Sequence, residues 1–506
     1  MSLAQLLISS GYLPSELPPP FSMEGYAANL DKLPKDLDTV GPPFSRCAYH
    51  SIPRLQHLRR LLGIPNPLHQ LKLAMLVEHY WPEIEKHMAQ SLLSLTRLEV
   101  NPDPPRALLK TGGFDDLDTA RVLRSSASRF LLQADLSRFY HTLYTHSIPW
   151  ALHTKEVAKA RKKDRGLFGN LIDEAVRNTQ DQQTMGIPVG PDTSDLISEL
   201  LGVALDLQLI DASPALVGLR FVDDYYLYFA TRSEAESALA DLHRVASHFA
   251  VEINPLKTTI RELPESLQPR WKGELRSRVI RPDQERQDLL TFFSSAFENA
   301  VKYPGHNVLK FAVKQSTAHA ISADNWELYE SFLLGSLLSE PILAPTLAPI
   351  LIKYRSDRYP FDLGKLTNSF AEVAFYHAKV RHGFEVAWAL WLCKLFSIAL
   401  PEKSLREISL VDDPVVALLA LDLKFAGLAD RLDTSLWSTH MQADNLYSEN
   451  WLLAYEAYVK GWLPSLDGSD YVAADGFFGI LSKNGIEFYD TGTRDPSVDS
   501  GWLEGY

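Results

Sequence analysis

Three aspartates stand at the ends of apolar, strand-like runs. Asp135 ends the run at 130–136 (FLLQADL), and Asp223 and Asp224 separate two such runs within 217–230 (VGLRFVDDYYLYFA). Neighbouring carboxylates repel one another and lose solvation between apolar strands, so this setting favours a bound cation. An isolated Asp-Asp pair is more typical of an exposed turn, but a third acid in the same setting favours a shared site.

Three carboxylates at strand ends can hold two Mg²⁺ ions, because Mg²⁺ prefers oxygen ligands, and Mn²⁺ is the alternative ion. Two such ions, about 3.5–4 Å apart, activate an attacking hydroxyl and stabilise the leaving phosphate in an in-line displacement. The pattern therefore predicts a two-metal phosphoryl-transfer site formed by Asp135, Asp223 and Asp224.

Four short motifs follow one another along the chain around these acids. They are 135–140 (DLSRFY), 186–190 (GIPVG), 221–224 (FVDD), and then Asn254 with Lys257. In this order they resemble motifs A, B, C and D of the reverse transcriptases. The resemblance implies a palm fold and a DNA-polymerising nucleotidyltransferase that uses dNTPs.

The resemblance also implies a role for each matching residue. Tyr140 would be the sugar gate, whose ring clashes with a ribose 2′-hydroxyl and so selects deoxynucleotides. Lys257 would protonate the leaving pyrophosphate, and Pro188 and Gly190 of motif B would contact the incoming nucleotide. The carboxylates that ligate the two metals would be Asp135, Asp223 and Asp224.

The stretch 135–150 (DLSRFYHTLYTHSIPW) narrows the resemblance. It is similar to the same region of the bacterial abortive-infection (Abi) defence reverse transcriptases, in particular the AbiK-like branch, and 52–67, 449–463 and 477–488 are more loosely similar. This family implies anti-phage defence, homo-oligomers, and a polymerase half followed by a helical-repeat (HEAT-like) half. It also implies template-independent synthesis from a protein tyrosine, which leaves single-stranded DNA covalently attached.

Two positions depart from ordinary reverse transcriptases. Val189 stands where template-copying members carry a Gln that helps to position the nucleotide, and valine offers neither donor nor acceptor. Phe221 replaces the usual Tyr of motif C, which is a smaller change. Two alternatives stay open: an RNA-templated reverse transcriptase, which requires a basic channel, and a catalytically silent defence scaffold whose helical half binds a partner.

The elements that must position these residues change in type along the chain. Helical spacing predominates over 55–95, and the acid-bearing runs and 257–263 (KTTIREL) are typical of strands. From about 285 onward the spacing is almost entirely helical. We therefore expect an α+β protein, with reverse-transcriptase-like fingers and palm at 1–285 and an all-α domain at 286–506.

The overall composition limits the class of protein. The chain has 506 residues, enough for two domains. Its net charge of −13 disfavours broad duplex binding, but 155–165 (KEVAKARKKDR) carries six basic and two acidic side chains, and local fields decide where a polyanion docks. With only Cys47 and Cys393, neither a disulfide framework nor a Cys-rich zinc site is expected. No segment has the pattern of a signal peptide or a membrane span, so we expect a cytoplasmic protein with no membrane contact.

Two further groups of residues are candidates for function. Three arginines could belong to a fingers region that meets the triphosphate: Arg54, Arg59 and Arg60. Tyrosines near the two ends of the chain are candidates for the priming hydroxyl: Tyr12, Tyr26, Tyr489 and Tyr506. The sequence does not choose among these tyrosines.

Overall fold

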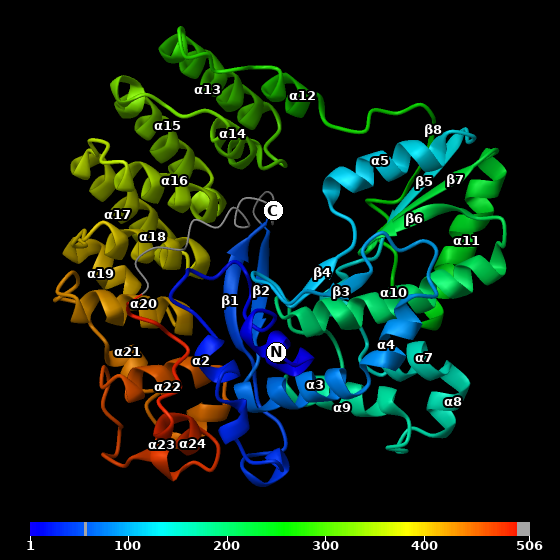
Figure 1. Ribbon diagram of the computed structural model, residues 1–506, viewed down its shortest axis with the longest axis horizontal. Helices are drawn as coiled ribbons and strands as arrows, with labels where there is room; N and C mark the ends of the chain where they lie inside the picture. The colour runs from blue at the N-terminus through cyan, green and yellow to red at the C-terminus, as the bar shows by residue number, and fades with distance from the viewer. Residues whose placement is uncertain (55–57, 493–506) are drawn as a thin grey trace. The chain divides into compact units, whose positions relative to one another are not determined.

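A computed structural model describes residues 1–54 and 58–492, which form two compact units (Figure 1). Unit 1 consists of Met1–Pro14, Met23–Cys47 and Gly63–Leu267. Unit 2 consists of Ser15–Ser22, Ala48–Leu62 and the chain from Gln268 onward. The sequence placed one boundary near residue 285, whereas the units divide after Leu267 and unit 2 also takes two segments from the N-terminal part of the chain.

Unit 1 contains a four-stranded antiparallel sheet in the order β6-β7-β5-β8. The expected strands are confirmed, and their bounds are β5 Phe130–Asp135, β6 Val217–Phe221, β7 Asp224–Phe229 and β8 Thr259–Glu262. Strands β6 and β7 form a hairpin, and β5 pairs with β7 on its other side. The C-terminal ends of β5 and β6 and the start of β7 therefore meet at the same end of the sheet.

Helices cover this sheet. Leu117 of α5 (Phe114–Ser125) packs with apolar side chains of β5, β6 and β7 such as Leu131, Leu219 and Tyr226. Side chains alternate between the faces of a strand, so Tyr225 points to the opposite face, where its hydroxyl donates to Asp206 of α10 (Asp192–Ala212) at 2.8 Å. The sheet therefore lies between α5 and α10, with α11 (Arg232–His248) packed against β5, β7 and β8.

The remaining elements of unit 1 surround this core. A short ladder joins β3 (Leu98–Val100) to β4 (Leu108–Lys110). The other helices are α1 Leu3–Ser9, α2 Glu24–Ala27, α3 Pro67–His79, α4 Trp81–Met88, α6 Phe139–Thr142, α7 Ser147–His153, α8 Lys155–Ala160 and α9 Phe168–Asn178. Helix α11 begins at a capping box, in which the amide of Glu234 donates to Thr231 Oγ1 and the amide of Thr231 donates to the Glu234 carboxylate.

The expected helix over 55–95 is only partly correct. Helices α3 and α4 are present, but Arg59–Ile64 is a strand, β2, which pairs with β1 (Ala48–Pro53). The apolar residues of the β2 sequence RRLLGI also fit helical spacing, so periodicity over so short a run cannot exclude a strand. Pairing with β1, a tertiary contact, decides the outcome.

Unit 2 is almost entirely helical. Its helices are α12 Arg270–Arg276, α13 Glu285–Lys302, α14 Val308–Ser316, α15 Trp326–Ser339, α16 Ala344–Ser356, α17 Leu363–Lys379, α18 Gly383–Leu395, α19 Glu402–Ile408, α20 Pro414–Phe425, α21 Ser435–Ser438, α22 Trp451–Val459, α23 Tyr471–Ala474 and α24 Phe478–Lys483. Helix α17 packs on α18 and α19, α18 on α20, and α20 on α22, while β1 packs on α18 and α20. The chain is thus an α+β protein that is mostly helical.

In the described ranges, no helix combines the length and the apolar character that crossing a membrane requires.

Candidate active site

The structure brings the three motif aspartates to one end of the sheet. Asp135 and Asp224 are cross-strand partners in the β5–β7 ladder. Phe221 and Asp224 are partners in the β6–β7 ladder, so Val222 and Asp223 form a two-residue turn between these strands. The backbone carbonyl of Asp223 accepts from the amide of Leu136 at 3.0 Å. The turn is therefore tied to the residue that follows Asp135, and the three carboxylates belong to one cluster.

The turn that carries Asp223 has a strained backbone. Val222 has φ +57°, in the left-handed region that a β-branched residue rarely adopts. Two contacts hold it there: the amide of Val222 donates to Thr96 Oγ1 at 3.1 Å, and the Val222 carbonyl accepts from Arg220 Nη1 at 2.9 Å. Strain of this kind persists where surrounding contacts over-determine the conformation, and it is frequent at functional sites.

Arg220 holds the turn from the face of the sheet that α10 covers. Its side chain is 1% exposed and lies between two carboxylates of α10, at 2.9 Å from both Glu199 and Asp206. Gly202 of α10 makes room for it, because a Cβ there would lie 2.5 Å from Arg220 Cζ. This network was not expected from the sequence. The sequence feature that could have indicated this network is the presence of Glu199 and Asp206 inside the apolar run of α10. They lie seven residues apart, which is about two helical turns and places them on the same face.

Asp135 has two partners on the segment that precedes β8. Its Oδ1 accepts from Asn254 Nδ2 at 3.0 Å, and its Oδ2 accepts from Lys257 Nζ at 2.6 Å. The backbone is joined as well, since the amide of Asn254 donates to the carbonyl of Asp135 at 2.8 Å. Asp135 is 3% exposed, whereas most of the Lys257 side chain is in solvent. The residues expected as motif D therefore lie directly against the acid of motif A.

The environment of Asp224 shifts the pKa of this carboxyl group. Burial, together with the neighbouring charges of Asp223 and Asp135, raises its pKa from 3.8 to about 7, and Lys257 opposes this rise. Crowded carboxylates with oxygen donors only are the ligands that Mg²⁺ or Mn²⁺ takes, and such a cation would relieve this repulsion. The residues present therefore fit the expected ions, with Lys257 neutralising part of the charge from the side of Asp135.

Tyr140 lies on α6, immediately after the first acid of the cluster. Its hydroxyl donates to Asp195 Oδ1 at 2.6 Å and lies 3.0 Å from Ser198 Oγ, both on α10. Burial and the Asp195 carboxylate raise the pKa of Tyr140 well above its ordinary value, and Asp223 adds to the shift. The half-buried ring is thus held in one position by its hydroxyl, within the electrostatic field of Asp223.

The motif B loop packs against N-terminal segments of unit 1. The Gly63 amide donates to the carbonyl of Val189 at 2.9 Å, and a Cβ on Gly63 would lie 2.8 Å from Pro188. Gly190 has φ +129°, and a Cβ there would lie 2.5 Å from Pro14. Close packing therefore accounts for Pro188 and Gly190 by itself, and their expected contact with a nucleotide stays a prediction.

The candidate priming tyrosines near the N-terminus are enclosed. Tyr12 and Tyr26 are 0% exposed, and the hydroxyl of Tyr26 donates to the carbonyl of Pro67 at 3.0 Å. Tyr489 is equally buried, and its hydroxyl donates to Asp422 at 2.6 Å. Tyr506 lies outside the described residues. None of the three described tyrosines presents a hydroxyl to solvent in this conformation.

Arg59, expected in a nucleotide-binding fingers region, belongs instead to unit 2. Its guanidinium pairs with both carboxylate oxygens of Glu385, with Nη2 2.9 Å from Oε2, and it also donates to Ser51. Arg59 is therefore engaged in an ion pair inside unit 2, and its expected contact with a triphosphate stays a prediction.

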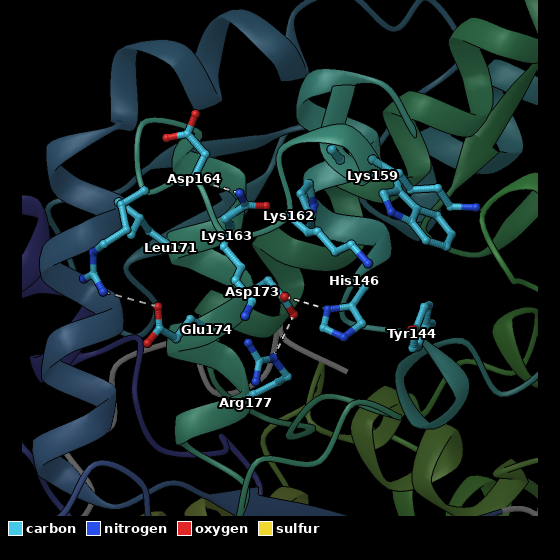
Figure 2. Close-up of a pocket in the computed structure, with 15 residues that line it drawn as sticks. Tyr144, His146, Lys159, Lys162, Lys163, Asp164, Leu171, Asp173, Glu174 and Arg177 are labelled. Atoms are coloured by element: carbon cyan, nitrogen blue, oxygen red, sulfur yellow. Dashed lines mark hydrogen bonds and ion pairs between the residues drawn. The ribbon is translucent and has the colours of Figure 1, made fainter. Parts of the chain in front are cut away.

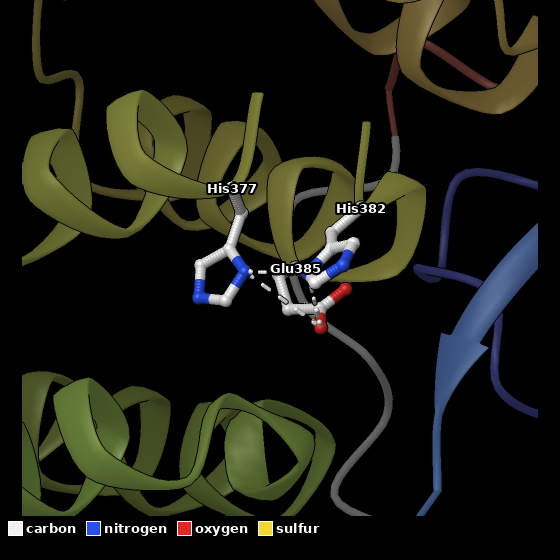
Figure 3. Close-up of side chains that lie close together, drawn as sticks. All are labelled: His377, His382 and Glu385. Carbon is white, nitrogen blue, oxygen red and sulfur yellow. Dashed lines mark hydrogen bonds and ion pairs between the residues drawn. The ribbon is translucent and has the colours of Figure 1, made fainter. Parts of the chain in front are cut away.

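The same Glu385 forms a small polar cluster with His377 and His382 (Figure 3). The two imidazole Nδ1 atoms are 3.1 Å apart and lie 3.8 and 3.6 Å from Glu385 Oε1. These are residue types that bind metals, but the guanidinium of Arg59 already neutralises the carboxylate. The hydrogen bond between the two imidazoles, together with the ion pair between Arg59 and Glu385, accounts for the arrangement of the cluster.

No family model matches the sequence, and no curated protein matches it. Among solved structures, apo telomerase of Candida tropicalis truncated from its C-terminal domain is similar with a TM-score of 0.32 and 10% identity, over 45% of this chain and 52% of that one. Apo telomerase of the same organism follows with a TM-score of 0.31 and 10% identity, over 62% and 67%. Telomerase of Candida albicans in complex with the TWJ fragment of telomeric RNA has a TM-score of 0.30 and 11% identity, over 76% and 67%. The chain spans about half the length of the first of these structures, and the likeness to all three is distant.

Proposed function

We propose that unit 1 is the polymerising half of a reverse-transcriptase-type nucleotidyltransferase. The observation that carries the proposal is the convergence of Asp135, Asp223 and Asp224 at one end of the four-stranded sheet, on a strained turn held by a buried ion network. Crowding acids in this way costs stability, so the arrangement favours a function that uses their combined charge.

The proposed reaction transfers a deoxynucleotidyl group to a hydroxyl. The hydroxyl oxygen forms a bond to the α-phosphorus of a dNTP, the bond from that phosphorus to the pyrophosphate oxygen breaks, and the hydroxyl proton leaves to solvent. When bound, two Mg²⁺ or Mn²⁺ ions held by the three aspartates would neutralise the charge that develops on the phosphate. In this proposal Lys257, whose ammonium lies 2.6 Å from Asp135, would donate a proton to the departing pyrophosphate.

Tyr140 supplies the proposed preference for deoxynucleotides. Its ring is fixed by the hydrogen bonds to Asp195 and Ser198, so it cannot easily turn aside for a ribose 2′-hydroxyl. Val189 supports independence from a template, because its side chain offers no hydrogen bond to a nucleotide. Protein priming, a covalently attached single-stranded product, homo-oligomerisation and a role in anti-phage defence rest on the family resemblance of the motifs alone.

The first test supplies purified protein with Mg²⁺ and labelled dNTPs, without template or primer, and separates the products on a denaturing gel. We expect label that stays with the protein, resists RNase and is removed by DNase. Extension only after addition of a primed RNA would replace the proposal with a template-copying enzyme. No incorporation in either condition would favour a silent scaffold.

The variant Asp223→Asn is expected to abolish incorporation, because it removes a charge from the cluster while keeping the size of the side chain. Asp31→Asn, at an exposed position of unit 1, is the matched control and should keep wild-type incorporation. Circular dichroism should be the same for both variants, and Asp223→Asn should unfold at a temperature no lower than the control does, because it removes repulsion from the cluster. Activity near wild type in Asp223→Asn would refute the assignment of this residue.

A further inference from the structure

A second concave site lies in unit 1, formed by α7, α8, α9 and the 161–167 loop (Figure 2). It encloses a volume of about 870 Å³, within the range of roughly 300–1,000 Å³ that is typical of ligand sites. Its walls contain three lysines and one arginine from the basic segment 155–165, and aromatic side chains from the segment that follows Tyr140. No residue of this pocket is used by the proposed reaction.

The acidic residues of the pocket are already neutralised. Asp173 is 5% exposed and accepts from His146 Nδ1 at 2.7 Å and from Arg177 Nε at 3.3 Å. Glu174 pairs with Arg165 at 3.6 Å. Figure 2 shows these contacts as dashed lines.

The third acid is also satisfied within its own loop. Asp164 accepts from Arg161 Nε at 2.8 Å and from the backbone amide of Gly166 at 2.7 Å, and these bonds lower its pKa. Each carboxylate that lines the pocket therefore has a cationic partner.

Three lysines remain without such a partner. Within 1–54 and 58–492, no carboxylate lies within 4 Å of the ammonium groups of Lys159, Lys162 or Lys163, all of which line the pocket. Figure 2 shows Lys162 and Lys163 extending from the loop after α8 into the pocket. The pocket thus has a surplus of positive charge in a chain whose net charge is −13.

Aromatic rings form the facing wall. Tyr144 makes edge contacts with His146 and Trp150, with ring centroids 5.0 and 5.6 Å apart, and all three rings are half-buried. Lys159 Nζ lies 5.6 Å from the Trp150 ring, so cation and aromatic face are adjacent. Ammonium groups beside aromatic rings are what proteins use to bind single-stranded nucleic acid, where phosphates meet the lysines and bases stack on the rings.

This wall follows Tyr140 in the chain and is joined to the motif B loop. Tyr144 lies four residues after Tyr140 and forms a β-bridge with Met185, next to the motif B loop. The amide of Gly186 donates to the carbonyl of Leu143 at 2.8 Å, which extends the pairing by one step. A strand leaving the acid cluster along this segment would meet the pocket.

We propose that this pocket binds single-stranded DNA, with Lys162 and Lys163 at the phosphates and Trp150 against a base. The inference deepens the proposed function, since the strand would be the product of the same enzyme. An acidic peptide would contact the lysines but not the aromatic rings. A free nucleoside triphosphate would contact both, without being part of a strand of linked nucleotides.

The test measures fluorescence anisotropy of a labelled oligo(dT) of about 10 nucleotides, a length within the site sizes of single-strand binders. The full-length double variant Lys162→Gln/Lys163→Gln should bind about tenfold more weakly at ~0.1 M salt and reduce the salt slope by about 1.4, from about 0.7 per phosphate contact. The matched control Lys32→Gln/Lys35→Gln removes the same charge from exposed positions of unit 1 and should bind as wild type does. Trp150→Leu should weaken binding by about tenfold without changing the salt slope.

Equal losses in the pocket variant and in the control would overturn the proposal, because net charge alone would then explain binding. So would competition by oligoglutamate of equal charge as effective as competition by unlabelled oligo(dT), or by dTTP at equal phosphate concentration. The proposed function is scored separately, by incorporation in the wild type and its loss in Asp223→Asn, which should still bind the oligonucleotide. Incorporation together with unchanged binding in the lysine variant refutes the pocket alone, whereas pocket-dependent binding without any incorporation refutes the polymerase alone.

Discussion

Asp135, Asp224 and Lys257 form a partly compensated charge cluster. The ammonium of Lys257 lies against one oxygen of Asp135, and Asn254 lies against the other, while Asp224 faces two further acids and has its pKa raised to about 7. The positive charge is therefore located on the side of Asp135, and the repulsion is concentrated on the pair at the hairpin. A cation bound beside Asp224 would offset the repulsion that this carboxyl group meets from Asp223 and Asp135.

Tyr140 allows a prediction about the choice of sugar. If its ring blocks a ribose 2′-hydroxyl, Tyr140→Ala should incorporate ribonucleotides relative to deoxynucleotides roughly 10–100-fold better than the wild type. Tyr140→Phe keeps the ring and loses only the bonds to Asp195 and Ser198, so it should keep most of the discrimination. The measurement is kcat/KM for dTTP and for UTP. Equal discrimination in the wild type and in Tyr140→Ala would show that the ring has no such role.

Helix α10 is the element that supports the hairpin, and it depends on a glycine. Gly202→Ala would place a methyl group 2.5 Å from Arg220 Cζ and displace the guanidinium from Glu199 and Asp206. We expect a loss of about 1–3 kcal/mol in the free energy of unfolding, greater than the gain of about 1 kcal/mol that alanine brings to a helix interior.

Gly335→Ala is the matched control for this substitution. Gly335 lies inside α15, and a methyl group added there would meet no neighbouring atom within 4 Å, so the change should be neutral or stabilising. Urea unfolding measures both variants. If the two substitutions change the free energy of unfolding equally, the contact between Gly202 and the Arg220 guanidinium is not important for stability.

In α22, a buried acid should make stability depend on pH. Glu456 is 0% exposed, and burial raises its pKa from 4.5 to about 7. Between pH 4.5 and pH 7 the folded protein keeps a proton on Glu456 that the unfolded chain has released. The stability that comes from burying the neutral carboxyl group is therefore fully present below about pH 4.5 and is lost as pH rises through 7. Glu456→Gln keeps an oxygen for the amide of Phe488 and cannot ionise.

The measurement is urea unfolding of both proteins from pH 4.5 to pH 8. Relative to Glu456→Gln, the wild type should lose stability with rising pH, by about 3 kcal/mol in total for a pKa raised from 4.5 to about 7. The difference between the two proteins cancels the titration of the other buried acids. A difference that does not vary with pH would mean that Lys460, 3.4 Å away, keeps Glu456 ionised throughout.

Local pattern was sufficient to predict some elements and insufficient for others. The strands that carry Asp135 and Asp224, and the turn that carries Asp223, could be predicted because apolar β-forming residues flank the acids, and convergence follows once β6 and β7 form a hairpin beside β5. Strand β2 could not, because its pairing with β1 is not visible in the spacing of its own residues. The partners of Arg220 and the burial of the candidate tyrosines depend on contacts distant in sequence, which no local pattern contains.

At the scale of the whole molecule, the two units share the N-terminal part of the chain between them. Unit 2 uses segments that precede most of unit 1 in the chain: Trp388 Nε1 donates to the carbonyl of Glu16 at 2.9 Å, His50 Nδ1 lies 2.8 Å from Asp413, and Arg59 pairs with Glu385. The single boundary expected from the change in pattern near residue 285 misses this exchange. Unit 2 is therefore complete only when Ser15–Ser22 and Ala48–Leu62 are present.

Arg59→Met tests this dependence inside the full chain. Glu385, 3% exposed, would be left without its cation, at a cost of roughly 3–5 kcal/mol for a fully buried pair. Because the Arg59 side chain is 22% exposed, we expect about 2–3 kcal/mol. Hydrogen exchange should accelerate in α18, which carries Glu385, and in β1, while α10 and β5 in unit 1 keep their protection.

Lys365→Met provides the comparison, because Lys365 pairs with Glu327 at an exposed position of the same unit, where an ion pair contributes about 0–1 kcal/mol. Its exchange should match that of the wild type. Equal loss of protection in α10 and α18 of Arg59→Met would mean that the two units unfold as one cooperative body. Loss confined to α18 and β1 would mean that the N-terminal segments stabilise the helical unit alone, although they are encoded ahead of the acid cluster.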